Sequence, residues 1–482
     1  MKIRRLTALI GLWAAAAALR GYAYELNGWP AFVLQKDESG ATVEWQGAGP
    51  LVFREPAPGP EPGTAAGLRP FYVRTEQGGV VKTDILYPLF FFRKYPDSYS
   101  WSVLQLINGQ GTDARPGDGT DLAEKRFDVW PFYFSLKADT PADSYQALFP
   151  VAGTLKGRLG FRQVSWVLFP LYVELHMKGT ETRYTPFPFI RTYTGAANGF
   201  AIWPLFGSTK GPGVSSHFYA AWPLFWNNVV APGPDAPEGT APTTQFGLLP
   251  LYTRDAGPGL VSENYLWPFF GYTERTAPFR YSERRYLWPF VVQGRGDDHV
   301  VDRWAPFYAY SNAKGADSTW VAWPLWHQKT WSDADLGQTK TQFFYFLYWS
   351  QDQRSLSRPG LAHAYKRHYW PLLSVWDNGA GSRQVQFPSP LEVFFPDNPD
   401  MRLTWSPLFS LYRYDHRPTG ETRSSVLWNA LTWRRGPDGE LREFHLGPLV
   451  GMRRLDSGEA WSILGFDIGT KPTDSKPPNR QQ

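Results

Sequence analysis

The apolar residues of this chain recur in short clusters that are separated by polar, glycine-rich segments. Each cluster centres on an aromatic residue, a proline, then Leu or Phe, and often a second aromatic residue. The clearest copies are Trp203-Pro204-Leu205-Phe206, Trp222-Pro223-Leu224-Phe225, Trp267-Pro268-Phe269-Phe270 and Trp323-Pro324-Leu325-Trp326. Most of the central prolines follow one another at intervals of 16 to 21 residues. Self-similarity at a nearly fixed period indicates a repeat architecture, and here it extends along nearly the whole chain.

We regard the tryptophan and the proline at the centre of each copy as structural anchors of the repeat. These anchors are Trp203 with Pro204, Trp222 with Pro223, Trp267 with Pro268, Trp288 with Pro289, Trp323 with Pro324, and Trp370 with Pro371. Weaker copies keep the proline without the tryptophan, as in Gly49-Pro50-Leu51, Ser406-Pro407-Leu408 and Gly447-Pro448-Leu449. Because the tryptophans recur at the same place in the copies, we interpret them as residues that hold the sheet rather than as a glycan-binding face. We expect Trp267 and Leu205 to pack in a core.

The aromatic and β-branched residues around each anchor favour β-strands. The segments between anchors carry turn residues, for example Gly296-Asp297-Asp298, Asn312-Ala313-Lys314-Gly315 and Asp377-Asn378-Gly379. The pattern therefore predicts one strand of roughly 8 to 12 residues in each repeat, with the anchor proline near the strand centre. After residue 23 there is no long stripe of helical period.

These strands predict an all-β fold, an antiparallel meander that closes into a large barrel of roughly 20 to 24 strands. Val167, Phe169, Leu171, Val173 and Leu175 form one fully apolar face, as in a strand that contacts lipid. The alternative is a soluble β-solenoid or an open, curved sheet of β-repeats. Proline distinguishes the two, because it lacks an N–H. In mid-strand it leaves a ladder acceptor unpaired, whereas at a corner it costs no ladder bond.

The N-terminus predicts a secretory signal peptide in residues 1–23. A positively charged start precedes the apolar stretch Leu6–Leu19, which is short for a membrane span. Gly21 and Ala23 supply the small residues that cleavage before Tyr24 requires. We therefore expect an exported protein of a double-membraned bacterium.

The remaining chain predicts one domain and a tail. Residues 24–469 carry the repeats and are expected to form a single β-repeat domain, and residues 470–482 are expected to form a polar C-terminal tail. The predicted location is the bacterial outer membrane, with the periplasm or the cell surface as the alternative.

The amino-acid composition limits the range of possible functions. The chain has no cysteine, which excludes disulfides, thiolate metal sites and a cysteine nucleophile. The net charge of +5 is small for 482 residues and no block of Lys or Arg stands out, so nucleic acid is not an expected partner. Aromatic residues make up 17% of the chain, which fits residues at lipid–water boundaries.

The sequence offers few candidates for catalytic or metal-binding residues. The sequence contains none of the common zinc-protease, serine-hydrolase or phosphate-loop motifs, and we predict neither an enzyme nor a cofactor. The eight histidines are scattered, and His363 and His368 have a poor spacing for a metal. The glycine-rich loop with Asp113, Asp118 and Asp121 and the pair Asp333 and Asp335 offer calcium-type oxygens, but solvated loops explain them better. Glu174 and Glu392 are expected inside strands, where a barrel would point them into its lumen.

Taken together, the pattern predicts an outer-membrane β-barrel that acts as a channel or as a structural component of the envelope. Outer-membrane lipid is the expected partner. The alternative function is a periplasmic or surface β-repeat protein that binds a glycan or an envelope protein.

Overall fold

The computed structural model describes residues 24–37, 39–59, 61–112, 124–233, 236–237, 239–455 and 458–471. The predicted signal segment, the loop with Asp113, Asp118 and Asp121, and residues 472–482 of the predicted tail lie outside the described residues. The chain divides into two compact units. Unit 1 combines the chain up to Pro96 with the chain from Phe346 onward, and unit 2 is Asp97–Tyr345.

Unit 1 contains strands from both ends of the chain and two short helices. Its elements are β1 (Tyr24–Gly28), β2 (Phe32–Lys36), β3 (Thr42–Gly47), β4 (Val52–Pro56), β5 (Gly63–Leu68), β6 (Tyr72–Gln77), β7 (Val80–Ile85), β8 (Phe90–Lys94), β34 (Tyr348–Ser355), β35 (Ala364–Tyr369), β36 (Leu373–Asp377), β37 (Arg383–Phe387), α2 (Pro399–Thr404), α3 (Ser406–Phe409), β38 (Tyr412–His416), β39 (Thr422–Val426), β40 (Leu431–Arg435), β41 (Leu441–Leu446), β42 (Val450–Leu455), β43 (Gly458–Ile463) and β44 (Phe466–Lys471).

Unit 2 consists of the strands between them. They are β9 (Ser98–Val103), β10 (Ile107–Thr112), β11 (Lys125–Val129), β12 (Tyr133–Lys137), β13 (Tyr145–Leu148), β14 (Ala152–Lys156), β15 (Gln163–Val167), β16 (Tyr172–Met177), β17 (Thr180–Tyr184), β18 (Ile190–Gly195), β19 (Asn198–Ile202), β20 (Phe206–Lys210), β21 (Ser216–Ala220), β22 (Phe225–Val230), β23 (Thr243–Leu248), β24 (Tyr252–Gly257), β25 (Leu260–Tyr265), β26 (Phe270–Arg275), β27 (Tyr281–Tyr286), β28 (Val291–Gly296), β29 (His299–Trp304), β30 (Tyr308–Ala313), β31 (Ala316–Val321), β32 (Trp326–Asp333) and β33 (Leu336–Phe343).

Each repeat contributes two short strands, not the single longer strand that the sequence predicts. Strands β31 and β32 pair antiparallel, with Val321 opposite Trp326, and Ala322–Leu325 form the turn between them. The predicted position of the anchor proline at a strand centre is therefore wrong, because Pro324 lies in that turn. The physical reason is that proline has a fixed φ and no N–H to donate, which suits a turn better than a ladder.

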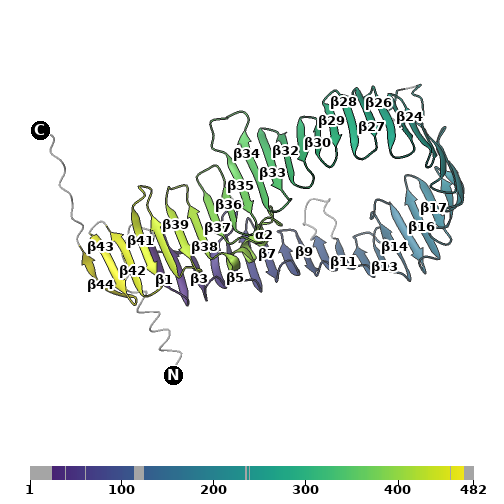
Figure 1. The fold of residues 1–482 in the computed structure, drawn as a ribbon. Helices are drawn as coiled ribbons and strands as arrows, with labels where there is room; N and C mark the ends of the chain where they lie inside the picture. Colours follow the sequence, from purple (N-terminus) through teal and green to yellow (C-terminus); the bar gives the residue numbers. More distant parts are fainter. Residues whose placement is uncertain are drawn as a thin grey trace. The chain divides into compact units, whose positions relative to one another are not determined.

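The all-β antiparallel meander is confirmed, but its closure into a barrel is wrong. The first described strand, β1, pairs with β2, and the last, β44, pairs with β43. No pairing joins β1 to β44 among the described residues, so the open, curved sheet of the alternative holds. Figure 1 shows the successive hairpins of unit 2 and the bend along its sheet.

Unit 1 has two sheet layers that face each other. Strands β1–β8 form one layer and β34–β44 the other, drawn in purple and in green to yellow in Figure 1. Side chains join the layers directly. Glu25 of β1 pairs with Arg423 of β39 at 2.9 Å, and Asn429 donates to Gln46 of β3 at 2.9 Å. The interior of this unit is therefore largely polar.

A segment between β37 and β38 carries the two helices and also links the layers. The side chain of Asn398 caps α2 by accepting from the Met401 N–H, and Pro399 occupies the first turn, where its missing N–H costs nothing. Trp405 donates through Nε1 to the Tyr87 carbonyl at 2.8 Å. Ser406-Pro407-Leu408 belong to α3, so the prediction that they form a copy of the strand repeat is wrong.

None of the helices in the described ranges combines the length and the apolar character needed to cross a membrane.

The main apolar cluster lies in unit 2. It is formed by side chains of β12–β17, namely Phe134, Leu136, Tyr145, Ala147, Leu155, Val164, Trp166, Val173 and Tyr184. Leu155 and Trp166 are each about 5% exposed. In unit 1 a smaller cluster of Phe53, Ala65, Val73 and Leu403 surrounds the buried Arg69 guanidinium, which stacks on the Phe53 ring at 3.4 Å.

Candidate functional site

The structure places all the predicted Trp–Pro anchors in hairpin turns. Trp203 and Pro204 follow β19, Trp222 and Pro223 follow β21, Trp267 and Pro268 follow β25, Trp288 and Pro289 follow β27, Trp323 and Pro324 follow β31, and Trp370 and Pro371 follow β35. Every one of these turns joins an odd-numbered strand to the next even-numbered strand. In the antiparallel meander of unit 2 the five such turns share one edge of the sheet, which we call the aromatic edge.

Hydrogen bonds run from turn to turn along the aromatic edge. The Trp323 N–H donates to the Pro306 carbonyl at 2.8 Å, and the Trp222 N–H donates to the Pro204 carbonyl at 2.7 Å. Pro204 and Pro306 thus accept a bond through their carbonyl oxygens. The peptide bond before each of the anchor prolines is cis. Because each anchor proline lies in a turn outside the strand ladder, its missing N–H costs the ladder no donor.

The side chains at the aromatic edge are exposed rather than packed in a core. Leu205 is 62% exposed, Trp267 is 45% exposed and Phe307 is 75% exposed. The expectation that Trp267 and Leu205 lie in a core is therefore wrong. The residues after the proline lie at the tip of a tight turn, and none of the described strands of unit 2 forms a second layer over them.

Neighbouring rings contact one another just behind the tips. The ring centroids of Phe149 and Phe169 are 5.1 Å apart, those of Phe169 and Phe187 are 5.5 Å apart, and those of Trp222 and Trp226 are 5.7 Å apart. Tilted and edge-to-face pairs at such distances are favourable. These ring pairs contribute to the stability of the sheet, whereas Leu205 and Phe307 at the tips are exposed.

The opposite edge of the sheet is polar. Its turns include Lys178-Gly179, Asp297-Asp298 and Lys314-Gly315 in unit 2. Gly179 and Gly315 have φ values of +77°, a region that glycine adopts without steric cost. The two edges of the meander therefore differ sharply in chemistry.

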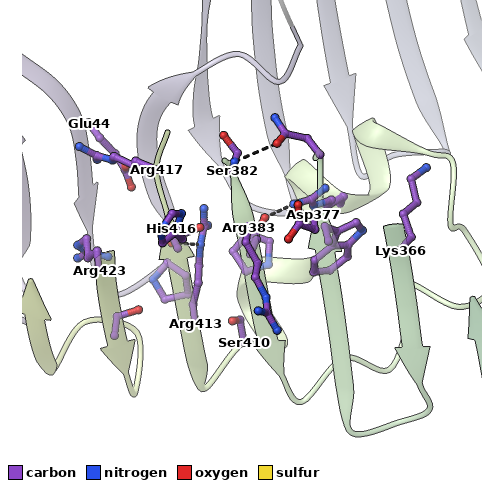
Figure 2. A pocket seen from close by; sticks show the side chains of 18 of the residues that line it. Glu44, Lys366, Asp377, Ser382, Arg383, Ser410, Arg413, His416, Arg417 and Arg423 are labelled. Atoms are coloured by element: carbon purple, nitrogen blue, oxygen red, sulfur yellow. Dashed lines mark hydrogen bonds and ion pairs between the residues drawn. The ribbon is translucent and has the colours of Figure 1, made fainter. Parts of the chain in front are cut away.

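A second feature, which sequence reasoning missed, is a cavity of about 640 Å³ inside unit 1. It is lined by strands of both layers, with Glu44 from β3 on one side and Arg413 and Arg423 from β38 and β39 on the other (Figure 2). A smaller cavity of about 380 Å³ adjoins it and shares Glu44, Arg402 and Arg413 in its lining.

Cationic groups outnumber anionic groups around the larger cavity. The cationic side chains are Lys366, Arg383, Arg402, Arg413, Arg417 and Arg423, and the carboxylates are Glu44, Asp377 and Asp415. Part of this charge is neutralised within the wall. Arg413 pairs with Asp415 two residues away on the same strand at 2.8 Å, and Lys366 pairs with Asp397 at 2.7 Å.

Arg423 is held by a buried network beside the cavity. Its Nε lies 2.9 Å from Glu25 Oε2, and its Nη2 donates to Asn429 Oδ1 at 2.8 Å. Thr432 donates to the other Glu25 oxygen at 2.6 Å. Burial alone would raise the pKa of Glu25, but the charge of Arg423, with His445 and the Thr432 hydroxyl, lowers it to about 2. Glu25 and Arg423 thus form a fixed ion pair.

Arg402 is in a different situation. Its guanidinium lies over the Trp376 ring at 4.0 Å and donates to the Gln384 side chain, and no carboxylate of the described residues forms an ion pair with it. Burial, together with the charge of Arg413, lowers the pKa of Arg402 to about 10. The protein therefore holds this cation at an electrostatic cost.

A buried hydrogen-bonded chain links His368 and Glu392, which both line the smaller cavity. His368 Nδ1 contacts the Ser374 hydroxyl at 2.7 Å, Ser374 contacts Ser389, and Ser389 donates to Glu392. Glu392 lies between β37 and α2, so its predicted place inside a strand is wrong. Burial, and then the charge of Arg402, lowers the pKa of His368 to about 4, so this imidazole is neutral at pH 7.

One cluster of potential metal ligands lies in unit 2, on β16 and β17. It consists of Glu174, His176 and Glu181, with His176 Nε2 at 2.6 Å from Glu174 Oε1. Glu174 is inside a strand, as the sequence predicts. Arg183 forms ion pairs with both glutamates and already supplies the positive charge that a metal would bring. We assign no metal to this cluster.

The prediction that the chain is not an enzyme stays a prediction. At the rim of the larger cavity His416 Nδ1 contacts the Gly381 carbonyl at 2.7 Å, and the Ser410 hydroxyl donates to the Tyr412 carbonyl. Both side chains are thus hydrogen-bonded to backbone carbonyls in the cavity wall, and they do not contact each other as a nucleophile and its base would.

No model of a known protein family matches this chain, and no curated protein matches it.

Proposed function

We propose that this protein is an exported component of the bacterial envelope that attaches to a lipid bilayer through its aromatic edge. The proposal takes up the open β-repeat form of the sequence-based alternative. A channel would need a closed wall, and the described strands β1 and β44 remain unpaired with each other. Export rests on the predicted signal segment in residues 1–23.

The observation that carries the proposal is the chemical difference between the two edges of unit 2. Exposed Trp, Phe and Leu side chains occupy the turns of one edge, as at Leu205, Trp323 and Phe307. Polar residues and glycines predominate at the other edge, where exposed apolar side chains such as Leu159 and Val214 are scattered. Trp is enriched where a lipid bilayer meets water, and large exposed apolar surfaces mark interaction sites.

A lipid surface suits this edge better than a protein partner does. Successive turns of one edge are separated by two strands, which is about 10 Å. The same kinds of side chain return at each step, so the row is uniform along its length. A bilayer surface is uniform in the same way, whereas a protein partner would require a local departure from the repeat.

Vesicle co-sedimentation tests the proposal. The full chain is mixed with phosphatidylethanolamine–phosphatidylglycerol vesicles, and we expect it to pellet with them. A variant with Trp203, Trp222, Trp267, Trp288 and Trp323 changed to Ser should remain in the supernatant. Because these side chains are at least one-third exposed, circular dichroism should show the same strand content in this variant.

The matched control changes exposed apolar residues on the opposite edge. Leu159 and Val214 lie in the turns after β14 and β20 and are strongly exposed. Leu159→Ser with Val214→Ser should leave vesicle binding unchanged. Absence of binding by the native chain, or equal loss in both variants, would contradict the proposal. Retention of the chain by peptidoglycan or by an envelope protein without lipid would favour the glycan- or protein-binding alternative.

A further inference from the structure

The larger cavity of unit 1 is lined by more cationic than anionic side chains, and two of its arginines have no carboxylate partner among the described residues. Its lining holds one lysine and five arginines against three carboxylates. Four of the cations have a carboxylate partner within the protein, namely Arg423 with Glu25 at 2.9 Å, Arg413 with Asp415 at 2.8 Å, Lys366 with Asp397 at 2.7 Å and Arg417 with Glu421 at 3.7 Å. Arg402 and Arg383 form no ion pair among the described residues, so these two guanidinium groups are the cations left for a ligand.

Arg402 is the cation best placed for a ligand. It is fixed on both sides, since its guanidinium stacks on the Trp376 ring and donates to Gln384. Arg413 lies close enough for its charge to act on Arg402. Two guanidinium groups that face one cavity form a receptor for an oxyanion, because their planar donors match a carboxylate or a phosphate.

The rest of the lining suits the hydroxyl groups of a sugar. Amide side chains project from both layers, including those of Gln46 and Gln384. The indole N–H of Trp428 is buried and has no acceptor in the described structure, although this residue lines the cavity. A buried donor without an acceptor is costly, and a ligand oxygen would remove that cost.

From these observations we propose that the cavity of unit 1 binds an acidic saccharide, a sugar that carries a carboxylate or a phosphate group. Arg402 and Arg413 hold the anionic group, and Trp428 Nε1 with the amide side chains holds hydroxyl oxygens. The volume of about 640 Å³ lies within the range of small-molecule sites. The proposal is independent of the lipid contact, because the cavity lies within unit 1 and its walls do not include the turns of unit 2.

Calorimetric titration of the full chain tests the proposal. The probes are glucuronate and glucose 6-phosphate as acidic sugars, glucose as a neutral sugar, and inorganic phosphate as an anion without a sugar. We expect at least one acidic sugar to bind at least ten-fold more tightly than glucose and than phosphate. The two acidic sugars distinguish a carboxylate from a phosphate as the recognised group.

Two variants and a control locate the binding in the cavity. Arg402→Gln should weaken binding of the acidic sugar at least ten-fold and should leave the melting temperature unchanged or raise it. A merely structural arginine would instead lower the melting temperature. Trp428→Phe keeps the ring but removes the N–H, and it should weaken binding several-fold. Arg442→Gln removes a half-buried arginine of β41 outside the cavity, which pairs with Asp438, and this variant should bind like the native chain.

Four outcomes would overturn the proposal. The first is equal binding of glucose and the acidic sugars, and the second is no binding of any probe. The third is binding unchanged in both Arg402→Gln and Trp428→Phe. The fourth is phosphate that binds as tightly as the acidic sugars, because the cavity would then not recognise the sugar. If Arg402→Gln fails to fold, Trp428→Phe and the probe comparison still decide the proposal, and none of these measurements depends on vesicle binding.

Discussion

The two units of this chain use the same hairpin repeat but stabilise it in different ways. In unit 1 two layers of strands enclose polar side chains, and buried ion pairs such as Glu25 with Arg423 join them. In unit 2 the described strands form one curved sheet, whose buried side chains gather mainly on β12–β17. Along the rest of unit 2, many charged pairs lie on faces that water reaches, for example Arg254 with Glu263.

The difference teaches that the repeat specifies strands and turns but not what covers the sheet. A strand residue that meets a second layer becomes part of a buried network, whereas the corresponding residue in a single layer stays at the surface. The energetic consequences differ accordingly, because ion pairs at the surface contribute little and broken ion pairs in the interior cost much. Four measurements test this comparison.

The largest contrast should come from removing one arginine in each unit. Arg423→Gln leaves Glu25 buried without its cation and should lower the free energy of unfolding by about 3 to 5 kcal/mol. Arg254→Gln breaks a pair at 3.4 Å whose arginine side chain is 52% exposed, and it should cost less than about 1 kcal/mol. Urea denaturation of both variants checks the prediction. Similar losses would mean that the layers of unit 1 do not bury this pair.

A second contrast compares two leucines within unit 2. Leu155→Ala opens the apolar cluster and should lower the free energy of unfolding by about 2 to 5 kcal/mol. Leu205→Ala removes an exposed side chain from the aromatic edge and should change it by no more than about 0.5 kcal/mol. The same denaturation measurement applies. A large loss for Leu205→Ala would show that the aromatic edge is packed in solution.

The third test is the pH dependence of unit 1. The pKa of His368 is about 4 in the folded protein, below its ordinary value of 6.5, because burial disfavours its charged form. The buried neutral imidazole therefore contributes its full stability above pH 6.5. This stability is lost as the pH falls from 6.5 towards 4, because the unfolded chain then binds a proton that the folded protein does not. At pH 5 the loss should be about 2 kcal/mol, at 1.36 kcal/mol for each pKa unit.

Denaturation at pH 7 and at pH 5 measures this loss, and His368→Gln should remove the His368 share of about 2 kcal/mol while lowering stability at pH 7. Burial also lowers the pKa of His445 in unit 1, so this second histidine should add to the loss in the native chain and keep its share in the variant. Glu25, with a pKa of about 2, should add a further loss only below pH 4.5. A native chain that is equally stable at both pH values would refute the assignment of a buried neutral imidazole.

The fourth test concerns an anchor proline, where only a small effect is expected. Pro324→Ala restores an N–H in a turn where the ladder uses the Trp323 N–H instead. No ladder bond is gained, and the unfolded chain becomes less restricted, so stability should fall by about 0.4 to 1 kcal/mol. Differential scanning calorimetry measures the change. A reproducible rise in melting temperature would mean that position 324 belongs to a strand ladder.

The sequence alone determined the repeat, the β class and the positions of many polar turns. Aromatic and β-branched clusters at a nearly constant spacing favour strands whatever their surroundings, and the glycines and aspartates between them favour turns. The segments 296–298, 312–315 and 377–379 lie at hairpin ends, as predicted. These features are local, so the residues themselves carry the information.

The two-strand repeat could in principle have been predicted from the proline. The missing N–H of Pro324 disfavours a mid-strand position, yet the apolar residues on both sides resemble one continuous strand. Two short strands around an apolar turn and one long strand have nearly the same hydrophobic pattern. Only the hydrogen-bond pairing distinguishes the two arrangements, and Val321 opposite Trp326 shows two short strands around a turn.

The tertiary structure alone decided closure and the cavity. Whether β1 meets β44 depends on the curvature accumulated over the whole sheet, which no single repeat encodes. Arg402 and Glu44 are more than 350 residues apart in the sequence and become neighbours in one lining only because two layers of unit 1 face each other. Long-range contacts of this kind have no local signal, since their residues look like ordinary polar positions of a strand or a short helix until the second layer covers them.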